Sequence, residues 1–204
     1  YKGFVEGRAN DTLGHEAAGV VAAVAQPGRV QVGDRVVVMP QYPCGRCALC
    51  VSGDYIHCES TFAVEGEGRA TMAQYLLKPD WLLPVIPEEI SVEHGSMACC
   101  GLGPSFGAFE RMQLDGFDTV LITGLGPVGL GAVINASFRG ARVFAVDGVE
   151  WRRERALELG AEQVFEPDCL EAVREATDGR GVDAALDCSG AVPAHRLCID
   201  ATRR

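Results

Sequence analysis

The 204-residue sequence has little positive charge and no cluster of basic residues. Its 18 Lys and Arg residues are outnumbered by 28 Asp and Glu residues, which gives a formal net charge of -10 at pH 7. This charge repels nucleic-acid phosphates and anionic lipid headgroups. Nucleic acid and membrane surfaces are therefore not expected as partners.

Nothing in the sequence looks like a secretion signal or an uninterrupted membrane span. Tyr1 is followed by neither a basic n-region nor an apolar h-region, so we expect a cytoplasmic protein. The one long apolar run, residues 120–138, is interrupted by Thr123, Pro127, Asn135 and several glycines. Such interruptions predict a buried strand, a turn and a helix in place of a membrane span.

The composition is that of a folded protein. Hydrophobic residues make up 48% of the sequence and charged residues 23%, so the chain can bury a core. A length of 204 residues favours two domains. We expect the boundary between residues 1–101 and residues 102–204.

The pattern of apolar residues differs between the two halves. The first half is predicted to be mostly β, with extended segments at residues 16–25, 36–39 and 73–77, and residues 101–112 are helical in pattern. The second half alternates strands (119–123, 142–146, 163–165 and 182–186) with helices (128–139, 150–159 and a third that Asp168 is expected to cap). Gly160 and Gly179 are expected to end two of these helices. This alternation predicts an α/β fold with a doubly wound parallel sheet.

Four of the nine cysteines lie in one short segment, Cys44-x-x-Cys47-x-x-Cys50-x7-Cys58. This spacing lets four thiolates surround one tetrahedral Zn²⁺, so we expect a structural zinc site. An iron–sulfur cluster is the alternative, but the ferredoxin pattern has three residues before its fourth cysteine and a proline after it. His57 is expected to be a bystander. Reduced, metal-binding thiols are favoured over disulfides.

A glycine-rich hexapeptide, Gly124-Leu125-Gly126-Pro127-Val128-Gly129, follows a predicted strand and opens a predicted helix. In this context the first glycine allows a tight turn, the second lets the backbone approach a pyrophosphate, and the third lets helix and strand pack closely. The helix N-terminus supplies amide donors. The motif predicts a dinucleotide site, with a merely flexible loop as the alternative.

Asp147 ends the next predicted strand, about twenty residues after the glycines, where a carboxylate can accept hydrogen bonds from ribose hydroxyls. Its charge favours NAD over NADP, although Arg152 and Arg153 soften the repulsion of a 2'-phosphate. The alternative role for Asp147 is to cap the helix that begins near Glu150.

The motifs occur in an order that resembles that of a known enzyme family. Gly14-His15-Glu16, Gly33-Asp34-Arg35, the four-cysteine segment and the glycine-rich fingerprint occur in the order typical of zinc-containing alcohol dehydrogenases. The chain therefore resembles the medium-chain dehydrogenase/reductase superfamily over nearly all its length. The resemblance implies a mostly-β GroES-like catalytic domain followed by a Rossmann domain, both partial.

The resemblance also implies roles for individual residues. His15 and Cys100 would be ligands of a catalytic zinc, with Cys99 as the alternative cysteine. Glu16 would be a transient ligand or lie beside the ligands, unless it only holds an arginine. Arg152 would lie beside the adenosine ribose.

The implied activity is hydride transfer between NAD and the CH–OH group of a small alcohol or polyol, in a homodimer or homotetramer. The family draws its first catalytic-zinc ligand and a proton-relay Ser or Thr from a segment before Gly-His-Glu, but only 14 residues precede His15 and none is cysteine. The chain thus looks like a fragment truncated at both ends, expected to bind catalytic zinc weakly and to be inactive alone. The alternatives are a non-catalytic zinc- and nucleotide-binding module and a zinc-free quinone reductase relative.

Overall fold

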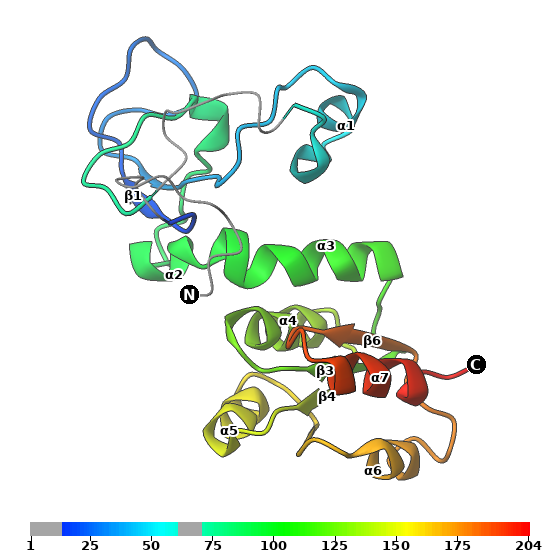
Figure 1. Cartoon of the computed structure of the whole chain (residues 1–204). Coiled ribbons are helices and arrows are strands. Elements are labelled where there is room, and N and C mark those ends of the chain that lie inside the picture. Colours follow the sequence, from blue (N-terminus) through cyan, green and yellow to red (C-terminus); the bar gives the residue numbers. More distant parts are fainter. Residues whose placement is uncertain (1–13, 61–70) are drawn as a thin grey trace. The chain divides into compact units, whose positions relative to one another are not determined.

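The fold is given by a computed structural model that describes residues 14–60 and 71–204. The chain divides into two compact units, Tyr1–Cys100 and Gly101–Arg204. Residues 1–13 and 61–70 of the predicted first domain lie outside the described residues. Figure 1 labels most of the helices and strands.

The first unit contains a small antiparallel sheet. Strand β1 (Ala18–Val20) pairs with β2 (Arg35–Val37), and the pairing continues beyond the strands because Val21 N–H donates to the Asp34 carbonyl at 2.9 Å. Val21, Val30 and Val36 form the buried cluster of this sheet. The strand is shorter than the apolar run 16–25 predicts, because residues 22–29 are exposed and form the turn before β2.

Short helices connect the rest of this unit. They are α1 (Ala48–Val51), the 3-10 turns η1 (Tyr55–His57) and η2 (Asp80–Leu82), and α2 (Val92–Ser96). The Ser91 hydroxyl caps α2 by accepting the His94 N–H at 3.1 Å. A π-helical turn, η3 (Ala98–Leu102), then precedes α3 (Gly103–Met112), so the helical segment predicted from residue 101 starts three residues earlier.

The second unit is built on four parallel strands: β3 (Thr119–Thr123), β4 (Arg142–Val146), β5 (Gln163–Phe165) and β6 (Ala184–Asp187). Their order is β5-β4-β3-β6. The chain moves outward from β3 to β5 and then returns to the other side of β3. The predicted parallel sheet is confirmed, and β3 and β6 form the point where the strand order reverses.

Helices cover both faces of this sheet. They are α4 (Pro127–Phe138), α5 (Glu150–Glu158), α6 (Leu170–Glu175) and α7 (Val192–Ala201). Val120 and Ile122 of β3 pack in one cluster with Val133 of α4, whereas Leu121 packs in another with Val173 of α6. Alternate residues of the strand therefore face opposite layers. Helices α6 and α7 lie beside each other on the second face (Figure 1).

Some local predictions for the second unit also differ from the structure. Asp168 does not cap α6: the N-cap is Cys169, the helix has no side-chain cap hydrogen bond, and Asp168 has a left-handed backbone with φ of +67°. Strand β6 begins at Ala184 and not at Val182, because Val182 pairs with Thr202 in an isolated bridge. Gly160 directly follows the C-cap of α5 with φ of +107°, as expected for a helix end, whereas Gly179, with φ of +77°, lies four residues beyond the end of α6 at Glu175.

No helix within residues 14–60 and 71–204 combines the length and apolarity needed to cross a bilayer.

Candidate metal centres and dinucleotide pocket

The four-cysteine segment brings its thiols together. The sulfurs of Cys44, Cys47, Cys50 and Cys58 all lie within 4.8 Å of one another. Those of Cys44 and Cys50 are 3.9 Å apart. Tetrahedral coordination with Zn–S bonds near 2.3 Å places two sulfurs about 3.8 Å apart. The spacing of the donors thus fits a zinc ion.

Backbone amides point at these sulfurs. Cys44 N–H donates to the Cys58 sulfur at 3.2 Å, and Cys47 N–H donates to the Cys44 sulfur at 3.3 Å. Amide donors, chiefly that of Cys50, lower the pKa of Cys47, while burial raises the pKa of Cys50 to about 12. Metal binding requires the thiolate form, so binding of a cation here would be coupled to loss of the thiol protons.

Two contacts fix the lobe formed by residues 44–58. The ring of Tyr55 packs on Trp81 with centroids 5.7 Å apart. His57 is turned toward Asp54, with its Nδ1 2.7 Å from a carboxylate oxygen. His57 is not part of the four-sulfur group.

A second group of possible ligands consists of His15, Glu16 and Cys100, whose donor atoms also lie within 4.8 Å of one another. His15 and Glu16 are exposed and Cys100 is half-buried. The Cys99 sulfur is instead 3.9 Å from the Val38 carbonyl oxygen. Burial, and then the charge of Glu16, raise the pKa of Cys100. The group offers one nitrogen, one oxygen and one sulfur, a set that suits a divalent ion such as zinc.

The backbone before His15 requires glycine. Gly14 has φ of +97°, and a Cβ there would lie 2.7 Å from the Thr71 hydroxyl. That hydroxyl donates to the Glu16 carbonyl at 3.1 Å. The turn at Gly14 therefore fixes the backbone position of His15 and Glu16.

In the second unit, the three fingerprint glycines have different surroundings. Gly124 has φ of +82°, and a Cβ there would lie 2.6 Å from Ser189. A Cβ at Gly129 would lie 1.8 Å from the Gly124 carbonyl oxygen, so the helix could not approach the strand. A Cβ at Gly126 would meet nothing within 4 Å. The fold itself requires the first and third glycines, whereas the second leaves open space beside the backbone.

This open space lies at the start of α4. Gly126 is the N-cap, Pro127 is the first helical residue and Val128 follows it. Amides of a first helical turn have no acceptor within the helix, and the helix dipole is positive there. The fingerprint therefore offers backbone donors and a positive potential to an anion such as a phosphate.

Asp147 lies just after β4 and holds this loop. One carboxylate oxygen accepts the Leu125 N–H at 2.7 Å and the other accepts the Val149 N–H at 2.8 Å. The Arg152 guanidinium is 3.6 Å from the same carboxylate, whereas Arg153 donates to the Asp147 carbonyl. Each carboxylate oxygen can accept a further hydrogen bond. Asp147 is not the side-chain cap of α5, whose N-cap is Val149.

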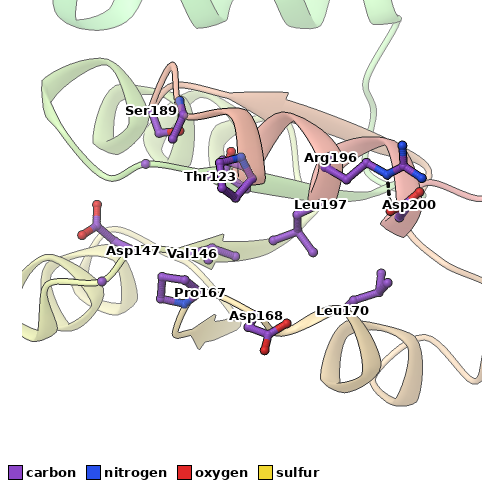
Figure 2. A pocket seen from close by; sticks show the side chains of 15 residues that line it. Thr123, Val146, Asp147, Pro167, Asp168, Leu170, Ser189, Arg196, Leu197 and Asp200 are labelled. Atoms are coloured by element: carbon purple, nitrogen blue, oxygen red, sulfur yellow. Dashed lines mark hydrogen bonds and ion pairs between the residues drawn. The ribbon is translucent and has the colours of Figure 1, made fainter.

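A pocket of about 710 Å³ opens at this edge of the sheet. Figure 2 shows Asp147 and Ser189 toward one end and Leu170 and Asp200 toward the other. The lining residues come from the carboxyl ends of the strands and from α6 and α7: Thr123, Gly124, Val146, Asp147, Gly148, Pro167, Asp168, Leu170, Ser189, Ala191, Pro193, Ala194, Arg196, Leu197 and Asp200. Its volume is within the range of small-molecule and cofactor sites.

Sequence reasoning named only part of this lining. Gly124 and Asp147 belong to motifs, and Ser189 follows a strand that was expected to end near the cofactor. Pro167, Asp168 and Arg196 carry no recognisable motif. The sheet order brings their loops together, and only the placement of β5 beyond β4 would have pointed to Pro167 and Asp168.

A parallel sheet with a glycine fingerprint, in a chain that also carries two groups of metal donors, is the combination found in zinc-type dehydrogenases. Family models agree with this class. Residues 1–88 match the alcohol dehydrogenase GroES-like domain and residues 127–204 match the zinc-binding dehydrogenase domain. The chain belongs to the zinc-containing alcohol dehydrogenase family of medium-chain dehydrogenases.

Individual relatives agree with this assignment. An uncharacterized zinc-type alcohol dehydrogenase-like protein YphC of Escherichia coli K12 is 35% identical, over 99% of this chain and 57% of the relative. A sorbitol dehydrogenase of Halalkalibacterium halodurans is 32% identical, over 100% of this chain and 61% of the relative. The crystal structure of an NAD-dependent alcohol dehydrogenase superposes with a TM-score of 0.86 at 30% identity, covering 94% of this chain and 57% of that one. The chain thus spans less than two thirds of the length of these relatives.

Proposed function

We propose that the protein is a zinc-dependent oxidoreductase that transfers a hydride between NAD and the CH–OH group of an alcohol or polyol. The observation that carries the proposal is the convergence of His15, Glu16 and Cys100, whose donor atoms lie within 4.8 Å of one another. Relatives named sorbitol dehydrogenase and D-xylulose reductase support polyols as the substrate class.

Each metal group has its own role in this proposal. The four sulfurs of Cys44, Cys47, Cys50 and Cys58 would hold a structural zinc, because a closed thiolate shell leaves no position for substrate. His15 and Cys100 would hold the second zinc, with Glu16 as a third donor or its neighbour. The chemistry that zinc supplies at such a site is polarisation of an alcohol or carbonyl oxygen.

The side chains of the second group suit this role. Cys100 is half-buried on η3, and the exposure of His15 and Glu16 leaves one side of the group open to a ligand. Cys99 faces the Val38 carbonyl, which supports Cys100 as the ligand. A zinc bound by three protein donors keeps a position for substrate.

The second unit would bind the dinucleotide. The pyrophosphate would lie against Gly126 and the first turn of α4. Pro127, which has no N–H, begins that turn, and the N–H groups of Val128 and Gly129 would be the donors. The ribose hydroxyls would donate to Asp147, with Arg152 beside them. The negative charge of Asp147 favours NAD over NADP. The chemistry that the nicotinamide supplies is acceptance or donation of hydride.

The remaining parts of the proposal concern organisation. Residues 1–101 would form the zinc-binding catalytic domain and residues 102–204 the cofactor domain. A homodimeric or homotetrameric state and a cytoplasmic location stay predictions.

The decisive test measures sorbitol and simple alcohol oxidation by NADH absorbance, in the protein extended to the length of its relatives and loaded with zinc. Wild type should turn over with NAD, and His15→Ala and Cys100→Ser should lose activity while retaining the cysteine-lobe zinc. If wild type binds NADH and zinc but oxidises neither kind of substrate, the non-catalytic zinc- and nucleotide-binding module is favoured instead.

A further inference from the structure

Asp187 is the last residue of β6, and its carboxylate accepts several hydrogen bonds. One oxygen accepts the hydroxyls of Thr123 at 2.7 Å and Ser189 at 2.6 Å, together with the Ser189 N–H at 3.0 Å. The other accepts the Gly190 N–H at 3.0 Å and lies 2.7 Å from His195 Nε2. The side chain is only 10% exposed.

These donors come from three elements that meet at the reversal point of the sheet. Thr123 ends β3 directly opposite Asp187, Ser189 and Gly190 form the turn after β6, and His195 is in the first half of α7. Asp187 does not line the pocket, but Thr123 and Ser189 do. The carboxylate therefore does not face the pocket itself, but it binds Thr123 and Ser189, two residues that line the pocket.

The turn that Asp187 holds is pressed against the fingerprint. A Cβ on Gly124 would lie 2.6 Å from the backbone nitrogen of Ser189 and 2.7 Å from its Cα. The Ser189 hydroxyl also accepts the Ala191 N–H at 3.1 Å. This hydrogen bond links the turn to Ala191, the N-cap of α7. A displaced turn would thus move one wall of the pocket relative to the glycine loop.

We infer that Asp187 is a positioning residue for the dinucleotide, which it serves by fixing the Ser189–Gly190 turn and the start of α7 around the pocket. The inference rests on the proposed binding of NAD to this pocket. It assigns to Asp187 no contact with the cofactor. Its effect passes through Ser189 and Thr123.

The chain provides a matched control, Asp183, directly before the other end of β6. Asp183 is 6% exposed and accepts the Thr119 N–H at 2.8 Å, and it pairs with Arg180 at 2.7 Å and Arg203 at 2.6 Å. It is also a buried, multiply bonded carboxylate of the sheet. None of its partners lines the pocket.

The experiment compares Asp187→Asn with Asp183→Asn. An asparagine at 187 keeps one acceptor oxygen but turns an NH₂ toward the other donors, so it cannot hold both the Ser189 and Gly190 amides. Hydrogen–deuterium exchange of the cofactor-free protein should speed up at residues 189–191 in Asp187→Asn and stay unchanged there in Asp183→Asn. Loss of charge-assisted hydrogen bonds should raise the NADH dissociation constant of Asp187→Asn about tenfold.

The two readouts separate the inference from the proposed function. If wild type binds no NADH, the proposed function fails, and the exchange of residues 189–191 still decides whether Asp187 fixes the turn. Exchange at these residues that is the same in wild type and Asp187→Asn overturns the inference. So does an NADH affinity that falls equally in both variants, because the effect would then be general destabilisation of the sheet.

Discussion

The Asp147 carboxylate accepts the backbone N–H of Leu125 at 2.7 Å, which joins the end of β4 to the glycine loop 22 residues earlier in the chain. The carboxylate is 8% exposed and its second oxygen accepts the Val149 N–H. The Asp147 side chain thereby shapes the loop that we propose binds the pyrophosphate. The same carboxylate carries the negative charge that we propose favours NAD over NADP.

Because Asp147 has these two roles, Asp147→Asn should change both the affinity for the cofactor and the preference between NADH and NADPH. The amide keeps the size of the side chain but loses the charge, so the NADH dissociation constant should rise about tenfold while the preference for NADH over NADPH shrinks. Fluorescence titration with both cofactors measures the two effects. Glu162→Gln, which removes a surface charge at the opposite end of the sheet, is the control. An unchanged NADH to NADPH ratio in Asp147→Asn would contradict the ribose role.

The unequal surroundings of the fingerprint glycines give a second prediction. Gly126→Ala adds a methyl group that meets no atom of the protein, so the free energy of unfolding should stay within about 0.5 kcal/mol of wild type. NADH binding should nevertheless weaken, because the methyl group enters the space proposed for the pyrophosphate. Urea unfolding and NADH titration of the same samples separate the two effects.

Gly129→Ala is the matched variant and should behave in the opposite way. Its methyl group would clash with the Gly124 carbonyl at 1.8 Å, so overpacking should cost about 1–3 kcal/mol or more of stability. Full NADH affinity in Gly126→Ala would show that the open space at this glycine is not a phosphate site.

The parallel sheet could be predicted because its strands are apolar on both faces and are separated by helices of ordinary length. In such a strand, neighbouring residues are both buried but pack on opposite faces of the sheet, as Leu121 and Ile122 do. The pocket walls could not be predicted in the same way. The sequence predicts Asp168 as a helix cap, yet the N-cap of α6 is Cys169, and Asp168 instead lines the same pocket as Asp147 because β5 lies beyond β4 in the sheet.

The choice between Cys99 and Cys100 shows a similar limit. The family resemblance favours Cys100 and leaves Cys99 as the alternative, whereas the different contacts of the two side chains depend on the π-helical turn that carries them. No local preference in the sequence indicates that turn. The four-cysteine lobe was more accessible to sequence reasoning, because its short spacings bring the sulfurs together without help from distant residues.

The two donor groups predict unequal zinc affinities. Four sulfurs form a complete tetrahedral shell, whereas His15, Glu16 and Cys100 provide three donors. Elemental analysis after dialysis against a chelator should find one zinc retained per chain and a second released at lower chelator concentration. Two zinc ions released together would contradict this order.

Cysteine variants then assign each ion. Cys50→Ser should lose the tightly held zinc and destabilise the lobe, because a buried ligand is removed from the shell. Cys100→Ser should lose only the weaker zinc, and Cys99→Ser should lose neither. Loss of the weaker zinc in Cys99→Ser, with retention in Cys100→Ser, would reverse the assignment.

Asp187 predicts a dependence of stability on pH. Burial alone would raise the pKa of Asp187, but the hydrogen bonds donated by Ser189, Thr123 and Gly190 outweigh it and lower the pKa to about 2. The unfolded value is about 3.9, so the charged carboxylate stabilises the fold above that pH by about 2 kcal/mol. This contribution is lost as the pH falls from about 4 toward 2.

Urea unfolding of wild type and Asp187→Asn across a pH series measures this contribution. The difference in free energy of unfolding should be present above about pH 5 and should shrink below about pH 4, where the wild-type carboxylate in the unfolded chain takes up a proton. Glu171→Gln, at an exposed position whose partner is Arg174, should show little difference at any pH because surface ion pairs contribute little. A difference for Asp187→Asn that grows as the pH falls would mean that the folded protein binds the proton more tightly than the unfolded chain, contrary to the hydrogen bonding at Asp187.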